Sequence, residues 1–206
     1  MRQHSVHLFV FDSMADWEPA LAIAAINNPQ FQQTPGRFRV VTVGLTRDPV
    51  TTMGGIRILP DVTLAELSPV ASAMLILPGG ESWEAGVNQT AVEVARAFIS
   101  TGVPVAAICA ATVALARAGL LDNRRHTGND RESLAVSGYA GRALYTDTPA
   151  VIDKHVITAS GLAPVDFARE IIRTLNLYNN EALEAWYALF KRGDAARFYD
   201  LARSAA

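Results

Sequence analysis

Cys109 is the single cysteine of this 206-residue chain and the side chain best suited to nucleophilic chemistry. It ends a short, apolar, β-branched stretch (103–109) and precedes a run of small, helix-forming residues (110–121). Where a strand runs directly into a helix, the first N–H groups of the helix lie beneath the junction side chain and favour a negative charge there. We therefore expect the Cys109 thiol to ionise more readily than a free thiol. The alternative is that Cys109 is a small core residue, as many unpaired cysteines are.

Two further features come at the starts or ends of neighbouring elements. Glu18 lies in the first turn of a helix expected over residues 16–28, and its carboxyl group could exchange a proton with a thiol. Acidic residues also favour helix N-termini on electrostatic grounds alone. Gly79 and Gly80 end a buried strand expected over residues 73–80, where glycine lets backbone N–H groups approach a developing oxyanion. The same pair could simply form a turn.

The elements that must position these residues alternate along the chain. Strands are expected over residues 5–10, 37–45, 73–80 and 103–109, with a short strand within 55–67 and two more within 143–160 that turn near Pro149. Helices are expected over residues 16–28, 89–101, 110–121, 131–138, 164–178 and 181–202. This alternation predicts an α/β fold with a mainly parallel sheet and helices on both faces. Chemistry in such folds gathers at the carboxyl ends of the strands, where Glu18, Gly79, Gly80 and Cys109 all fall.

Composition favours one domain over residues 1–206, with helices over about 164–202 at its C-terminal end. Half of the residues are hydrophobic, 18% are charged and the net charge is −2, which supplies an ample core. The chain has no block of like charges, and its clustered arginines suit solvent or carboxylates better than nucleic acid. No nucleic-acid partner is therefore expected.

Long apolar runs, cysteines and histidines are scarce in this sequence, and this scarcity bears on the cellular compartment and on cofactors. The apolar run 103–116 is too short for a bilayer, and the first strand reaches an acidic residue after few apolar ones, so neither a membrane anchor nor a signal peptide is expected. One cysteine suits a reducing, cytoplasmic setting. Four scattered histidines and one cysteine give no metal-ligand spacing, and we expect neither a metal nor another cofactor.

Five segments together resemble the ThiJ/PfpI superfamily, the class I glutamine-amidotransferase-like group that includes the parkinsonism-associated deglycase. They are Asp16-Trp17-Glu18, ILPGG (76–80), AAICAAT (106–112), AGLLDNRRHTGN (118–129) and ITASG (157–161). The resemblance spans roughly residues 5–176 and implies a flavodoxin-like three-layer sandwich with a nucleophile elbow. It also implies that Cys109 is the reactive cysteine and Glu18 its carboxyl partner. The oxyanion-side amides would be those of Gly79 and Gly80, with Ala110 at the helix N-terminus.

The departures from the family pattern concern histidine. Peptidase-like and amidotransferase-like members place a His directly after the nucleophile, and here that position is Ala110, which argues against both activities. Other members place a His after the elbow helix. In the register of Arg124 and Arg125 that position is Asn129, while His126 could reach the site from three residues earlier or lie on a surface turn.

Three functions remain open at this point. The first is a cysteine-dependent enzyme, of hydrolase, glyoxalase or deglycase type, in which Cys109, Glu18 and His126 act on a small carbonyl or acyl substrate. The second is a redox sensor or stress-response chaperone that uses oxidation of Cys109. The third is a family member without activity. A homodimer is also expected, from the resemblance and from apolar residues of the last helices: Leu183, Trp186, Leu189, Phe190 and Phe198.

Overall fold

The computed structural model describes residues 3–204, and a seven-stranded sheet forms its centre. The strands lie in the order β5-β2-β1-β6-β7-β9-β8, and every neighbouring pair is parallel except β8 and β9. Their bounds are β1 His4–Phe9, β2 Phe38–Gly44, β5 Val62–Thr63, β6 Ser72–Leu77, β7 Val105–Ile108, β8 Ala150–Asp153 and β9 Val156–Ala159. The expected mainly parallel α/β sheet is confirmed.

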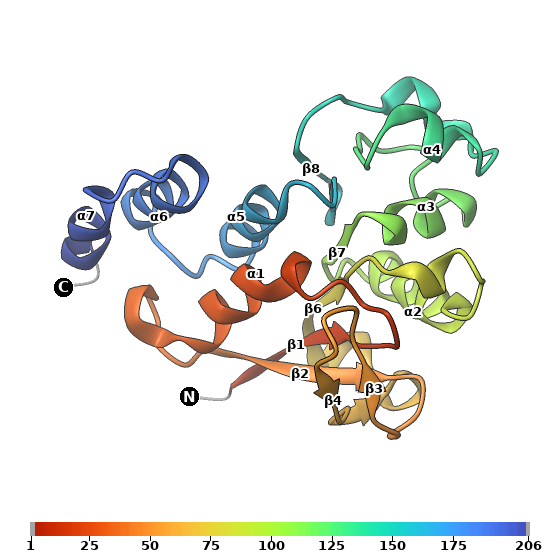
Figure 1. The fold of residues 1–206 in the computed structure, drawn as a ribbon, viewed down its shortest axis with the longest axis horizontal. Helices are drawn as coiled ribbons and strands as arrows, with labels where there is room; N and C mark the ends of the chain where they lie inside the picture. The colour runs from red at the N-terminus through yellow and green to blue at the C-terminus, as the bar shows by residue number, and fades with distance from the viewer. Residues whose placement is uncertain (1–2, 205–206) are drawn as a thin grey trace.

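Helices cover both faces of this sheet, and Figure 1 shows their arrangement. On one face α1 packs against α5, and on the other α2 packs against α3 and β7. The helices are α1 Trp17–Asn27, α2 Gln89–Ser100, α3 Ala110–Arg117, α4 Arg131–Ala135, α5 Pro164–Thr174, α6 Asn180–Arg192 and α7 Arg197–Ser204. None of the helices within residues 3–204 is both long and apolar enough to cross a bilayer.

The central strands β6 and β7 are almost entirely buried. All four residues of β7 and the last four of β6 are buried, so these strands contain no alternating polar face. A parallel strand that is covered by helices on both sides needs this continuous apolar pattern. Gly79 and Cys109 follow the carboxyl ends of these two buried strands.

The sequence did not predict the hairpin of β3 (Val50–Thr51) and β4 (Arg57–Ile58). These strands are only two residues long, too short for a period-2 pattern to show. The hairpin docks on the loop after β1, where Ser13 N–H donates to Thr51 O (2.9 Å) and Met53 N–H donates to Met14 O (2.9 Å). It thereby holds the loop that leads into α1 and Glu18.

Two boundaries differ from the sequence-based expectation. The turn between the last two strands lies at Lys154 and His155, both with positive φ, and not near Pro149, which precedes β8. The single helix expected over residues 181–202 is broken into α6 and α7, because Gly193 adopts a left-handed conformation (φ 68°) that ends α6.

The apolar residues of the last two helices do not all face outward. Leu183 and Trp186 are buried against the rest of the chain (3% and 4% exposed), so they stabilise this fold and are not available to a second copy. Phe190 and Phe198 are about half exposed (47% and 48%). Any dimer contact made by this region therefore has to use the outer residues alone.

Candidate functional site

Cys109 is the single residue that joins β7 to α3. Its backbone has φ 59° and ψ −129°, a conformation that costs a non-glycine residue about 1–3 kcal/mol and that needs support from its surroundings. Cys109 N–H donates to Ala159 O on β9 (3.0 Å), and the Cys109 carbonyl accepts from Thr112 N (3.0 Å) and Thr112 Oγ1 (2.6 Å). Bonds on both sides of the residue thus hold the half-buried thiol at the strand end.

Glu18 reaches the same place from the first turn of α1, and its side chain is completely buried. Gly79 N–H donates to Glu18 Oε2 (2.5 Å), whereas Oε1 has no hydrogen-bond partner of ordinary geometry. Burial raises the pKa of Glu18, while hydrogen bonds from Gly79 and with Cys109 act in the opposite direction. Burial of this carboxyl group beside the thiol therefore shifts its titration toward the neutral, proton-carrying form.

Asn129 is the third side chain at the sulfur. Its Nδ2 donates to Cys109 Sγ (3.3 Å), and its Oδ1 accepts from Gly161 N (2.9 Å). Thr127 anchors the same loop, since its N–H donates to Thr158 Oγ1 and its hydroxyl donates to Thr148 O. The Arg-Arg register had placed Asn129 in the position of the family histidine, and the structure brings that side chain to the thiol.

Two glycines make room for the sulfur and the carboxyl group. A Cβ atom on Gly79 would lie 2.6 Å from Cys109 Cβ, and one on Gly161 would lie 2.9 Å from Cys109 Sγ and 3.0 Å from Glu18 Oε1. Any side chain at either glycine position would therefore collide with Cys109 or Glu18. Sequence reasoning missed this role of Gly161; the available signal was a Ser-Gly pair directly after a buried strand.

Gly79 and His126 have other roles than those expected from the sequence. The N–H of Gly79 is given to Glu18, so it holds the carboxyl group and is not an open oxyanion donor. His126 is fully buried; its Nδ1 bonds Arg124 O (2.8 Å) and its Nε2 bonds the Tyr139 hydroxyl (2.8 Å). With both ring nitrogens engaged, His126 is no partner of the thiol, and burial lowers its pKa.

The expectation of an easily ionised thiol also needs correction. Burial raises the pKa of Cys109, and a negative charge on Glu18 would raise it further. The Asn129 amide and the Ala110 N–H act in the opposite direction, and the net direction is upward. The sequence suggested the helix N-terminus but could not show how deeply the thiol lies or that a carboxyl group lies beside it.

Known proteins resemble this chain in sequence and in fold. The sequence profile of the DJ-1/PfpI family matches residues 4–174. The chain belongs to the DJ-1/PfpI family. It is 37% identical over 204 residues to the uncharacterized protease YoaZ of Bacillus subtilis, covering 98% of this chain and 97% of that protein. It is 29% identical over 145 residues to the glutathione-independent glyoxalase DJR-1.2 of Caenorhabditis elegans, covering 68% and 75%.

The crystal structure of a thiJ/pfpI family protein from Bacillus anthracis superposes on this fold with a TM-score of 0.92. That protein is 39% identical, and the match covers 99% of this chain and 98% of that one. The DJ-1/PfpI fold therefore extends through α6 and α7 in at least one solved relative, beyond the segment matched by the family profile.

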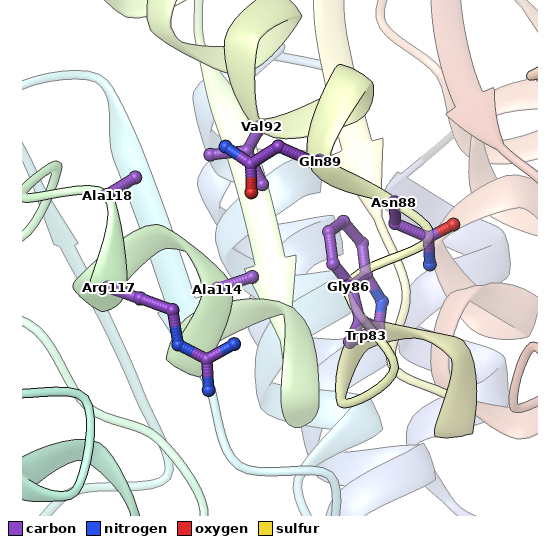
Figure 2. A pocket seen from close by; sticks show the side chains of 8 residues that line it. All are labelled: Trp83, Gly86, Asn88, Gln89, Val92, Ala114, Arg117 and Ala118. Carbon is purple, nitrogen blue, oxygen red and sulfur yellow. The ribbon is translucent and has the colours of Figure 1, made fainter.

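Space for a ligand lies beside the elbow of this DJ-1/PfpI chain. A cavity of about 110 Å³ is bordered by Ala110, Asn129 and Trp83. A neighbouring hollow of about 80 Å³ shares Trp83, Ala114 and Arg117 with it, and Figure 2 shows these side chains. Trp83 is itself buried and donates to Pro78 O (2.8 Å), so it forms a fixed wall. Within residues 3–204, no group of three or more acidic, histidine or cysteine side chains is placed to hold a metal ion.

Proposed function

We propose that this protein is a cysteine-dependent enzyme that converts small 2-oxoaldehydes into 2-hydroxy acids. The observation that carries the proposal is the placement of Cys109 Sγ between the Asn129 amide and the buried carboxyl group of Glu18. This arrangement pairs a nucleophile with one proton carrier and one neutral donor. It contains no imidazole.

The first step is addition of the Cys109 thiolate to the aldehyde carbon. A carbon–sulfur bond forms, the carbonyl π electrons move to oxygen, and the neutral Glu18 carboxyl group supplies the proton that completes a hemithioacetal. The N–H groups of Gly80 and Ala110 are the proposed donors to the developing oxyanion, because the N–H of Gly79 already binds Glu18.

The second step moves a proton between adjacent carbons. The Glu18 carboxylate, now ionised, removes the proton from the carbon bonded to sulfur, and the resulting enediol is reprotonated at the neighbouring carbon to give a thioester. Water then attacks the thioester, which releases the 2-hydroxy acid and restores the thiol. The overall change adds one water and needs neither an oxidant nor a reductant.

The departures at Ala110 and Asn129 weigh against amide hydrolysis. Family members with that activity place an imidazole beside the nucleophile to protonate the leaving nitrogen, and neither Ala110 nor the Asn129 amide supplies one. A thioester needs no such help, since a thiolate leaves readily. The name of the Caenorhabditis elegans relative also supports an aldehyde substrate, whereas the protease name of the Bacillus subtilis relative is attached to an uncharacterized protein.

The direct test is consumption of methylglyoxal by the purified protein without glutathione or added metal, with the product followed by NMR. The proposal expects turnover by the wild type and none by Cys109→Ser, because a serine hydroxyl at this position stays protonated. A Thr101→Ser variant, far from the site on the exposed end of α2, serves as the matched control. Equal rates for the wild type and Cys109→Ser would remove the enzyme proposal.

A second candidate function is a peroxide sensor that responds through oxidation of Cys109. The chain has no second cysteine to form an intramolecular disulfide, and the Asn129 amide already donates to the sulfur. Two equivalents of peroxide would convert the thiolate to a sulfinate and two waters. Intact mass after mild peroxide treatment should rise by two oxygens. A disulfide-linked dimer as the main product would count against this sensor.

A homodimer also stays a proposal. Phe190 and Phe198 are the half-exposed apolar side chains that the C-terminal helices could offer to a second copy. Light scattering at low micromolar concentration should give twice the chain mass, and Phe190→Ser together with Phe198→Ser should halve it. A monomer mass for the wild type would contradict the proposal.

A further inference from the structure

A third hollow lies at the carboxyl edge of the sheet, and Cys109 is not among the residues that line it. From β1 the chain builds the sheet in one direction through β2 and β5, and then crosses to β6 on the other side of β1. The strand order therefore reverses between β1 and β6, and parallel α/β sheets bind small molecules outside the strand ends at such a reversal. A cavity of about 460 Å³ opens at this point.

Loops from three strands line this cavity. Residues 10–12 follow β1, residues 45–50 follow β2, and residues 82–88 follow β6. Val10 and Phe11 are buried apolar residues on its wall, and Val87 is exposed at the same cavity. The volume and the largely apolar lining are those of a site for a small organic molecule.

Asn88 is the side chain in this lining that lacks a partner. The residue is 1% exposed, yet neither Nδ2 nor Oδ1 makes a hydrogen bond within the described residues. Asn88 is also the N-cap residue of α2 and makes no capping bond with its side chain, which is the usual use of asparagine there. Asn88 also borders the hollow of about 80 Å³ drawn in Figure 2, where it lies on the opposite side of the Trp83 ring from Ala114 and Arg117 in that view. A buried amide with both groups unused is unfavourable unless a ligand or water satisfies it.

The charged residues of the cavity are two aspartates. Asp12 Oδ1 accepts from Thr51 N (2.7 Å) and Asp48 Oδ2 accepts from Thr46 Oγ1 (3.0 Å), which leaves acceptor capacity on both carboxylates. Neither aspartate is in an ion pair with any cation among residues 3–204. Such carboxylates accept hydrogen bonds from hydroxyl groups and repel phosphate.

We propose that this cavity binds a neutral nucleoside. The base would lie on the apolar wall and pair its adjacent donor and acceptor with the Asn88 amide, as asparagine pairs with adenine elsewhere. The sugar hydroxyl groups would donate to Asp12 and Asp48. Cys109 does not line this cavity, and the proposal does not depend on the aldehyde chemistry proposed for Cys109.

Adenosine and adenosine monophosphate are the probes, titrated into the 15N-labelled full chain while the side-chain amide signals are followed. Adenosine should shift the Asn88 signals and leave those of Asn129 in place, and the monophosphate should bind at least about tenfold more weakly because of the two carboxylates. Cys109→Ser should bind adenosine like the wild type. No shift with adenosine, or equal affinity for the two probes, would overturn the proposal.

Asn88→Leu provides an independent readout, with Asn123→Leu at an exposed position as the matched control. The Asn88 variant should lose adenosine binding by at least about tenfold, while its Tm without ligand should rise by roughly 3 °C because an unpartnered buried amide is removed. The control should change neither quantity. Retained binding, or a fall in Tm that shows the amide to be satisfied in the unliganded protein, would contradict the assignment.

Discussion

The Cys109 site and the His126 cluster use the same loop yet differ in how completely their polar groups are satisfied. At His126 both ring nitrogens have partners, the side chain is fully buried, and Tyr139 and Tyr145 pack against it. Three residues later, Asn129 faces a thiol on a left-handed backbone and a carboxyl group with an unpartnered oxygen. The histidine therefore has a structural role here, and the reactivity that we propose lies where hydrogen bonding is incomplete.

The largest difference between the two regions is expected when one proton-bearing group is replaced in each. Glu18→Gln should lower kcat/KM for methylglyoxal by about 100-fold or more, because an amide cannot give and take the proton. His126→Gln should change kcat/KM by less than about threefold and should lower the free energy of unfolding by about 2 kcal/mol, since two buried hydrogen bonds are disturbed. Steady-state kinetics measure kcat/KM and urea unfolding measures the free energy of unfolding, each for both variants. A larger kinetic loss at His126 than at Glu18 would reverse the comparison.

The glycine that borders the sulfur offers the next test. Gly161→Ala places a methyl group 2.9 Å from Cys109 Sγ and should reduce the rate of thiol alkylation by at least about tenfold, because the new atom blocks approach and pushes the thiol aside. Ser160→Ala, one residue earlier, is the control and should leave the rate unchanged. Unaltered alkylation in Gly161→Ala would show that the sulfur has more space than this geometry allows.

Asn129 should have a smaller effect, confined to the thiolate. Its Nδ2 donates to Sγ and thereby lowers the pKa of Cys109. Asn129→Ala should therefore raise the thiol pKa and slow alkylation at pH 7 by about tenfold, the value of a hydrogen bond of about 1.5 kcal/mol to a charged group. Asn123→Ala, in the same loop region but without this contact, should match the wild type. A faster reaction in Asn129→Ala would exclude the amide as a thiolate donor.

The pH dependence gives the smallest but most specific signature. Activity should rise as Cys109 loses its proton and fall as Glu18 loses the one it carries, which gives a bell-shaped profile whose two apparent pKa values belong to the pair. Burial raises the pKa of both groups, so both limbs should lie above the pH expected for separate exposed groups. Asn129→Ala should move the limb set by the pKa of Cys109 to higher pH, and His126→Gln should move neither limb. A profile with a single limb would remove the proton-carrying role of Glu18.

The sequence was most informative where one local pattern decides the structure. The buried strands over residues 73–80 and 103–109, and the switch to small helical residues after Cys109, predicted both the parallel sheet and the strained junction. The same reasoning placed Glu18 in the first turn of α1. These inferences succeeded because strand and helix periodicities are local properties of the chain.

The partners of the thiol depended on contacts between distant segments. Asn129 and Gly161 lie 20 and 52 residues from Cys109, and only the loop anchored by Thr127 on β9 brings the Asn129 amide to the sulfur. Burial, which raises the pKa of Cys109 where the helix N-terminus alone suggested the reverse, is likewise a property of the packed molecule. Residue types could therefore single out the Cys109 thiol as a candidate but could not predict its electrostatic surroundings.

The proposed mechanism depends most directly on whether the proton between Glu18 and Cys109 lies on the carboxyl group or on the sulfur. The ultraviolet absorbance of the thiolate during a pH titration measures this. If the neutral Glu18 carboxyl group donates to the sulfur, Glu18→Leu removes a donor and raises the pKa of Cys109, and Glu18→Gln, which keeps an amide donor, raises it less. If Glu18 is instead an ionised carboxylate beside the thiol, both variants remove a repelling charge, and the pKa of Cys109 falls. A rise in the order wild type, Glu18→Gln, Glu18→Leu is the predicted result, and a fall in either variant would contradict the account.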